Sequence, residues 1–246
     1  MPLQHSKKRK SHHSDDSNAK RTKHSNTRLQ KGIDELWSAS SKQRSSTPKQ
    51  SEPFSVKKCI KWFKEFAGNK EQIEPDGVEK LCETCEVEPH DIVMLVLAYH
   101  LNAQTMGFFT LKEWTKGMHK LQCDSTVKLQ GKLPSLRSSL DEPSLFKSVY
   151  RYAFDFLKEP GQRTVDLGTA KAMLDVLLSD RWSLLDKFQN YLDGCKNKVI
   201  NRDQWNNVLE FSRMIQPDLS NYDMDGAWPV LLDEFVEYIK MHNEML

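Results

Sequence analysis

Apolar residues recur at three- and four-residue intervals through most of this chain, and this spacing is the strongest constraint on its fold. The pattern begins at Val56, continues through Ile60 and Phe63, and includes the strongly apolar stretch from Ile92 to Leu101. Such spacing places apolar side chains on one face of a helix. Runs that alternate apolar and polar residues between turn pairs, which would indicate strands, are nearly absent. The sequence therefore predicts an all-α body.

The first 53 residues differ sharply from this body. They contain 12 Lys and Arg against five Asp and Glu and almost no apolar residues, whereas the rest of the chain contains 24 basic and 29 acidic side chains. So little apolar surface cannot offset the entropy lost on ordering the backbone. We predict a disordered basic tail over residues 1–53 and one folded, acidic domain over residues 54–246.

The tail contains two basic clusters whose spacing suits a two-part nuclear import signal. The clusters consist of Lys7, Lys8, Arg9, Lys10, Lys20 and Arg21. A basic arm that binds nucleic acid is the alternative interpretation, because clustered Lys and Arg also attract phosphates. We expect a nuclear protein with some cytoplasmic population; the alternative function is a nuclear helical adaptor that binds nucleic acid or another protein through this tail.

Hydropathy and cysteine usage favour a soluble intracellular protein with no membrane contact. No apolar run approaches about 18 residues, and no apolar signal-peptide core follows the N-terminus. The chain has five cysteines, mostly within helical apolar patterns, as reduced core thiols are. Cys82 and Cys85 have the spacing of a zinc or redox pair, but no second pair completes a site. We expect no metal and no cofactor.

Two segments that lie 91 residues apart share one design. Residues 108–114 and 199–205 each contain two apolar residues, an N-cap candidate, a Glu or Gln three residues later, and then Trp. This duplication predicts two helical lobes, the first over about residues 54–123 and the second over about residues 143–246. A short pairing between loops would make each lobe EF-hand-like.

The loops do not have the composition of calcium sites. Residues 68–75 and 159–165 supply Lys or Arg and few carboxylates, whereas calcium requires six to eight oxygen ligands. We therefore expect EF-hand-like lobes without calcium loops. Between them, residues 125–140 contain Pro134 and many Ser and Lys, which predicts a broken, exposed connecting helix.

Residues 220–238 combine a turn-forming segment with a helix that begins after Pro229. An apolar stripe predicts docking of this helix on the core, and an acidic edge lies outside the stripe. The stripe comprises Leu231, Leu232, Phe235, Val236 and Ile239, and the edge Asp233, Glu234 and Glu237. By spacing alone, this is a terminal helix that closes a core and exposes its carboxylates to solvent.

The same run resembles the C-terminal signature of the defective-in-cullin-neddylation family, whose characteristic unit is the potentiating-neddylation domain. The resemblance extends over about residues 54–238 and includes residues 123–125, 160–162, 203–205 and 226–229. The chain looks like the basic-tailed branch, because we identify neither a ubiquitin-associated domain nor an N-terminal myristoylation signal.

The resemblance implies a scaffold rather than an enzyme, in line with the lack of any nucleophile motif or phosphate-binding loop. Members of this family act as co-ligases. They bind cullins and the acetylated N-terminus of the neddylation-conjugating enzyme, and they meet the RING-type ligase subunit through the cullin complex. They contribute no catalytic residue. We expect this chain to do the same as a monomer.

The cullin surface that the resemblance implies is an acidic patch that faces the basic winged-helix subdomain of the cullin. The matching positions are Asp203, Ala227 and Asp233. Carboxylates on an acidic body would steer a basic partner, and a small Ala would allow close approach. Asp203 has an alternative, local role, because a carboxylate in the first turn of a helix interacts favourably with the helix dipole.

The second implied surface is an apolar pocket in the first lobe that takes the acetylated N-terminal methionine of the conjugating enzyme. A neutral acetylated amine can enter such a pocket, whereas a free ammonium would lose its hydration. Met106 stands where better-known members carry Gln at the rim. The matching positions, which by spacing alone are core, are Cys82, Met94, Leu97, Ala98, Leu101, Met106, Phe109, Phe156 and Val176.

Overall fold

The computed structural model describes residues 52–243, and the side chain of residue 243 is not among those described. The residues from Pro53 onward belong to one compact unit. All six predicted import residues, and almost all of the tail that we predict to be disordered, lie outside the described residues. Those two predictions stay predictions.

The first lobe contains two helix–strand–helix segments whose strands pair with each other. Strands β1 and β2 are antiparallel, with Ile73 opposite Phe109, and both of these side chains are buried. Each strand has only two residues. Strand β2 leads directly into α5, and one residue separates β1 from α3. The elements are α2 (Val56–Ala67), β1 (Gln72–Ile73), α3 (Pro75–Cys85), α4 (Ile92–Leu101), β2 (Phe109–Thr110) and α5 (Leu111–Leu121).

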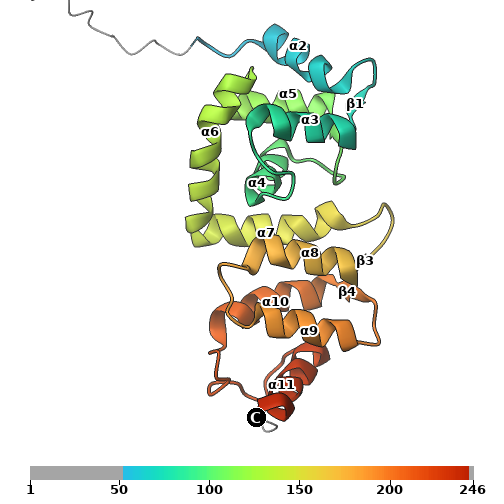
Figure 1. The fold of residues 1–246 in the computed structure, drawn as a ribbon, viewed down its shortest axis with the longest axis vertical. Helices are drawn as coiled ribbons and strands as arrows, with labels where there is room; N and C mark the ends of the chain where they lie inside the picture. The colour runs from blue at the N-terminus through green and yellow to red at the C-terminus, as the bar shows by residue number, and fades with distance from the viewer. Residues whose placement is uncertain (1–51, 244–246) are drawn as a thin grey trace, which may run out of the picture. The chain divides into compact units, whose positions relative to one another are not determined.

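The second lobe repeats this order of elements (Figure 1). Strands β3 and β4 are antiparallel, with Val165 opposite Ile200. The elements are α7 (Pro143–Leu157), β3 (Thr164–Asp166), α8 (Leu167–Leu178), α9 (Leu185–Gly194), β4 (Val199–Asn201) and α10 (Arg202–Met214). The prediction of an all-α body is confirmed, and the loops of each lobe pair through strands of two or three residues.

The repeated sequence motif has the same structural role in both lobes. Thr110 and Glu113 form a reciprocal capping box at the start of α5, and Asn201 and Gln204 form one at the start of α10. Trp114 and Trp205 follow these caps and are fully buried. Their rings lie 6.0 Å from Phe63 and 6.1 Å from Phe154, respectively, at corresponding places on α2 and α7.

The segment between the lobes is an unbroken helix, so the predicted break is wrong, whereas seven of its 13 residues are exposed, as predicted. Helix α6 (Thr126–Ser138) continues through Pro134 and ends in the 3-10 turn η1 (Ser139–Asp141). Leu129, Leu133 and Leu136 are buried, and α6 packs against α3 and α4. The proline removes a single intrahelical hydrogen bond, and burial of this leucine face offsets that loss. Figure 1 shows α6 joining the first lobe to α7.

The C-terminal helix α11 (Val230–Asn243) packs as its apolar stripe predicts. Leu232, Phe235 and Val236 are fully buried. The Phe235 ring lies 4.9 Å from Phe188 of α9 and 6.1 Å from Trp182, so α11 completes the core of the second lobe.

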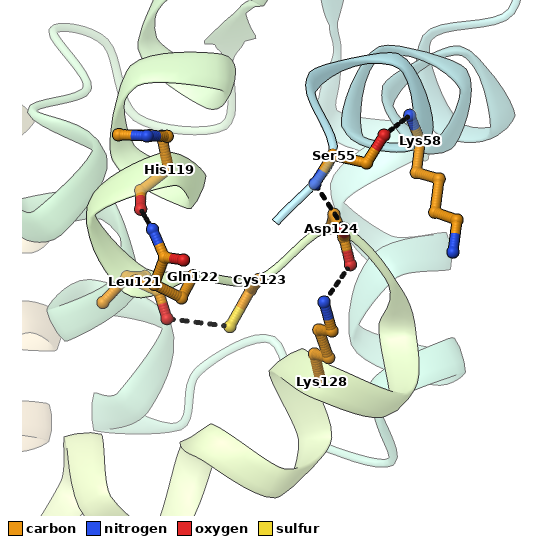
Figure 2. Close-up of polar contacts among 8 residues, drawn as sticks. All are labelled: Ser55, Lys58, His119, Leu121, Gln122, Cys123, Asp124 and Lys128. Atoms are coloured by element: carbon orange, nitrogen blue, oxygen red, sulfur yellow. Dashed lines mark hydrogen bonds and ion pairs between the residues drawn. The ribbon is translucent and has the colours of Figure 1, made fainter. Parts of the chain in front are cut away.

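One buried carboxylate ties the start of α2 to the junction of α5 and α6 (Figure 2). Asp124 is only 3% exposed. It accepts a 2.7 Å hydrogen bond from the Ser55 N–H and lies 2.8 Å from the Lys128 ammonium. Burial by itself would raise the pKa of Asp124, but the Lys128 and Ser55 hydrogen bonds outweigh burial and lower it. Ser55 in turn caps α2 by accepting from the Lys58 N–H.

Candidate functional site

An apolar cavity of about 180 Å³ lies where the two lobes meet. Its walls come from α3, α4 and the α4–β2 loop of the first lobe, and from α7 and α8 of the second. We predicted a pocket in the first lobe, but the predicted set already included Phe156 of α7 and Val176 of α8, and these two helices complete the wall, so the cavity lies between the lobes. The lining residues are Val78, Pro89, His90, Asp91, Met94, Leu95, Ala98, Met106, Gly107, Phe109, Phe156, Met173 and Val176.

Six of the nine predicted pocket residues line this cavity, namely Met94, Ala98, Met106, Phe109, Phe156 and Val176. The other three do not line it. Leu97 is fully buried in the core, Leu101 is buried and borders a separate depression, and Cys82 borders a neighbouring depression that shares Pro89 with the cavity. Met106 is 48% exposed, so it forms part of the cavity rim.

Several lining residues were missed by the sequence reasoning. Met173 precedes Val176 by about one helical turn on α8, and this spacing could have indicated it. Pro89 and His90 lie in the loop before α4, where no sequence pattern points to a cavity. Loop residues of this kind become lining residues only through the tertiary packing around them.

The cavity mouth is held in place by contacts that cross between elements. The Tyr152 hydroxyl donates a 2.8 Å hydrogen bond to the carbonyl oxygen of Ala103 in the α4–β2 loop. The Tyr152 ring stacks on Phe156, with centroids 5.4 Å apart, and meets Tyr99 edge-on at 5.5 Å. The loop and the Phe156 wall are therefore fixed by one side chain of α7.

Asp91 is the acidic residue of the cavity lining, and both its oxygens already have partners. Oδ1 accepts a 2.9 Å hydrogen bond from the Val93 N–H, which caps α4. Oδ2 forms an ion pair with Arg137 of α6. The carboxylate is thus neutralised by a charge that lies outside the cavity lining, and the cavity offers no unpaired negative group.

Of the predicted cullin residues, Asp203 lies in the first turn of α10 and is exposed. Asn207, one turn later, donates from Nδ2 to its Oδ1 at 3.2 Å. The adjacent Arg202 pairs instead with Asp155, 2.8 Å from Nη1 to Oδ2. The Asp203 carboxylate therefore faces solvent without a cationic partner among residues 52–243.

Ala227 and Asp233 lie on either side of the start of α11. Ala227 is exposed and precedes Trp228, whose ring packs 5.6 Å from Phe211 of α10. Asp233 accepts a hydrogen bond from the Tyr222 hydroxyl, and the pKa of Tyr222 is raised, first by burial and then by this bond. These contacts fix the α11 start against α10, and no described contact joins Asp203 directly to Asp233.

Other site chemistries find little support among residues 52–243. No group of three or more His, Cys, Asp or Glu there is arranged to hold a metal ion. Burial raises the pKa of Cys59, Cys82 and Cys85 to about 11, which keeps these thiols protonated and unreactive at neutral pH. No described helix combines the length and apolar character needed to cross a membrane.

Comparison with known proteins decides the family. The family described as "Cullin binding" matches residues 128–238. DCN1-like protein 4 of Danio rerio is 57% identical over 199 residues, which cover 81% of this chain and 71% of that protein. Human DCN1-like protein 5 is 57% identical over 192 residues, covering 78% and 81%, respectively. The chain belongs to the DCN1-like family.

Human DCN1-like protein 4 extends the likeness further along the chain. It is 52% identical over 234 residues, which cover 95% of this chain and 76% of that protein. The predicted family is thereby confirmed, and the cullin-binding match places this DCN1-like chain among cullin-binding proteins. The matched residues include Asp203, Ala227 and Asp233, and on the cavity side Phe156 and Val176.

Proposed function

We propose that this DCN1-like chain is a non-catalytic scaffold for cullin neddylation. It binds a cullin through the exposed Asp203 and the half-buried Asp233 of the second lobe, and the acetylated N-terminus of the neddylation-conjugating enzyme through the cavity between the lobes. The observation that carries the proposal is that six residues predicted from the family resemblance converge on one apolar cavity. The RING-type ligase subunit is reached through the cullin complex.

The chemistry of the cavity favours an acetylated over a free N-terminus. Its volume of about 180 Å³ is below the roughly 300 Å³ at which drug-sized ligand pockets begin, and suits one side chain with its terminal group. A free ammonium would have to be desolvated, at a cost of several kcal/mol unless it is paired. Asp91 is not available to pair with such an ammonium, because its carboxylate already forms an ion pair with Arg137. A methionine with a neutral amide end avoids this cost.

The decisive experiment is a titration of the full chain with acetylated and unacetylated N-terminal peptides of the conjugating enzyme. We expect the acetylated peptide to bind at least about tenfold more tightly, which corresponds to about 1.4 kcal/mol. Val176→Trp, which fills the cavity wall, should abolish this binding. Val127→Trp is the matched control, because Val127 is 77% exposed and lies outside the cavity lining. Equal binding of both peptides would refute the proposed pocket.

The cullin contact is tested separately. Asp203→Lys with Asp233→Lys should abolish binding to the cullin winged-helix subdomain, because it places positive charge against a basic partner. The milder pair Asp203→Asn and Asp233→Asn preserves size and should weaken binding in the same direction. Glu65→Lys with Glu71→Lys makes the same charge change on exposed first-lobe positions. If this control weakens cullin binding equally, only the net charge of the domain matters and the assigned surface is wrong.

The scaffold acts by proximity. Holding the charged conjugating enzyme and the cullin on one rigid domain makes their encounter effectively intramolecular and narrows the orientations sampled. The chemical step itself uses none of this chain's residues. Neddylation assays should therefore lose the stimulation by this chain, but keep the basal rate, when either surface is altered.

The basic clusters of the tail suit nuclear import, and we propose that this chain acts in the nucleus with some cytoplasmic population. Alanine substitution of Lys7, Lys8, Arg9, Lys10, Lys20 and Arg21 should shift a fluorescent fusion of the full chain toward the cytoplasm. An unchanged distribution would refute the import signal.

A further inference from the structure

A second and larger depression lies on the first lobe, on the other side of the α4–β2 loop from the cavity. It is about 970 Å³ in volume and lies between the end of α4, α5 and the first turn of α7. Gln104 lines this groove, whereas Met106, two residues later, lines the cavity. No residue lines both. We call this depression the α5 groove, and its lining comprises Tyr99, His100, Leu101, Asn102, Gln104, Thr110, Lys112, Glu113, Lys116, Gly117, Lys120 and Leu145.

One wall of the α5 groove is a stripe of lysines. Lys112, Lys116 and Lys120 are four residues apart, so they project from one side of α5. All three are exposed, and none forms an ion pair with a residue in the described range 52–243. The acidic residue at helical spacing is Glu113, three residues before Lys116, and it forms no ion pair with the stripe within the described range.

The single carboxylate in the groove lining does not cancel this charge locally. Glu113 Oε1 accepts from the Gln104 N–H at 3.1 Å, and Oε2 accepts from the N–H and the hydroxyl of Thr110 at 2.8 and 2.7 Å. These bonds turn the carboxylate toward the backbone of the α4–β2 loop and the α5 cap. The lysine ammonium groups are left to interact with a ligand.

Positive charge also reaches the groove from a neighbouring helix. Burial lowers the pKa of His100, and the nearby charges of Lys120 and Lys132 lower it further. Lys132 belongs to α6, so charges from two helices converge near this imidazole. The lowered pKa favours the uncharged imidazole, so the positive field of the groove comes from its lysines.

The floor of the groove is apolar and rigid. Tyr99 and Leu145 are half-buried and pack on the core while still lining the groove. Helices α4 and α5 approach closely at this floor, because a Cβ on Gly117 would lie 2.6 Å from the Leu101 Cα. The Tyr99 ring is fixed by its edge-on contact with Tyr152.

We propose that the α5 groove binds an acidic, extended segment of a partner protein, with carboxylates on the lysine stripe and an apolar side chain on the Tyr99–Leu145 floor. A protein segment suits the site better than nucleic acid or a lipid surface. Those ligands need a wide positive face, whereas the positive charge in the groove lining is one stripe of three lysines, within a domain of 29 acidic and 24 basic residues. The groove is a third binding surface, separate from the two that neddylation requires.

The test uses the full ¹⁵N-labelled chain and a fluorescein-labelled peptide of sequence Glu-Glu-Leu-Glu-Glu-Leu-Glu. We expect amide shift changes in residues 99–104 and 112–120, and binding that weakens as salt rises from 20 to 150 mM. Lys112→Glu, Lys116→Glu and Lys120→Glu together should weaken binding at least about tenfold, since three charged contacts become repulsive.

The matched control is Lys57→Glu, Lys61→Glu and Lys64→Glu. These three lysines are exposed at helical spacing on α2 and lie outside the groove lining, and the change in net charge is identical. The basic tail is present in all the proteins and contributes equally. If the control variant binds the peptide with an affinity within about twofold of that of the unaltered chain, the result supports the proposal, because single surface charges have small effects.

Three outcomes would overturn the proposal. An equal loss of peptide affinity in the two triple variants would show that the peptide is held by non-specific charge attraction. Shift changes that miss the groove at 1 mM peptide would show that the groove does not bind it. A single-stranded oligonucleotide of equal charge that displaces the peptide from the groove would make nucleic acid the better ligand.

Discussion

The two lobes use the same capped helix and buried tryptophan, yet only one of them satisfies that tryptophan. In the second lobe, the Trp205 indole N–H donates to the Tyr150 carbonyl at 2.9 Å, and the Tyr150 hydroxyl donates to the Trp205 carbonyl at 2.9 Å. In the first lobe, the Trp114 N–H forms no hydrogen bond of this geometry among residues 52–243 and faces the Cys59 thiol, a weak acceptor. Cys59 stands 91 residues before Tyr150, at the corresponding place on α2. A repeated motif therefore fixes the position of a side chain but not its polar partners.

The helix crossings differ as well. Gly117 of α5 lies against the Leu101 backbone, whereas the corresponding position on α10 is the fully buried Val208. The ionic contacts also differ, because Asp124 is buried between helices of the first lobe, while the Asp155–Arg202 pair of the second lobe is half-exposed. The first lobe thus depends on close backbone approach and one buried charge, and the second on larger side chains and aromatic hydrogen bonds.

The largest expected effect comes from the helix crossing. Gly117→Ala should lower the free energy of unfolding by about 2–3 kcal/mol, because the new Cβ meets the Leu101 backbone rather than a movable side chain. Urea denaturation followed by circular dichroism measures it. Gly131→Ala is the control, since nothing lies within 4 Å of its Cβ, and it should be neutral or stabilise α6 by up to about 1 kcal/mol. Equal effects at the two glycines would contradict the close-crossing argument.

The next effect separates the two ionic contacts. Asp124→Asn should cost about 2 kcal/mol, because it removes the charge that partners Lys128 inside the fold. Asp155→Asn should cost less than about 1 kcal/mol, because its pair with Arg202 is half-exposed and screened by solvent. Thermal and urea denaturation of both variants in the same buffer would show which of them loses more stability. A larger loss at Asp155 would reverse the comparison.

The same carboxylate predicts a dependence on pH. The pKa of Asp124 is lower in the fold than its ordinary value of 3.8, so its charged form stabilises the folded state. This contribution is present above about pH 4 and is lost as the pH falls through and below that value. Urea midpoints measured between pH 6 and 2.5 should fall less steeply for Asp124→Asn than for the unaltered chain. Parallel profiles would mean that other carboxylates dominate acid unfolding.

A smaller effect tests the tryptophans directly. Trp205→Phe should cost about 1 kcal/mol more than Trp114→Phe, because only the first change leaves a buried carbonyl, that of Tyr150, without its donor. The two substitutions remove the same atoms from fully buried sites, so the difference between their urea midpoints isolates the hydrogen bond. A greater loss of stability in Trp114→Phe would show that packing differences outweigh the hydrogen bond of Trp205.

The smallest expected change in stability comes from exchanging the charged and neutral members of the two capping boxes, Glu113 and Gln204. Glu113→Gln should cost, and Gln204→Glu should gain, about 0.3–1 kcal/mol, because a negative charge near a helix N-terminus interacts favourably with the helix dipole. Both changes keep the capping geometry. The effects should shrink in 1 M salt, which a denaturation series at two salt concentrations would measure. A salt-independent difference would point to the extra Gln104 contact of Glu113 instead.

Local patterns were enough to predict much of this architecture. The helical spacing, the two capping boxes and the apolar stripe of α11 depend on residues three or four apart, and all appear in the structure as the sequence indicates. The six convergent cavity residues came from the family resemblance, because nothing in their spacing distinguishes them from core. Pro134 misled the prediction for α6, since a proline signals a break only when no leucine face holds the helix in place.

By itself, the sequence determined the all-α class, the duplicated lobes and the acidic C-terminal helix of this DCN1-like chain, because capping and amphipathic spacing act within single helices. Only the tertiary structure decided that Pro89 and Met173 line the cavity, that Asp124 meets Ser55, and that three lysines of α5 line a groove. The physical reason is distance along the chain: a cavity, a buried ion pair or an uncompensated charge depends on neighbours tens of residues away, which no local pattern specifies.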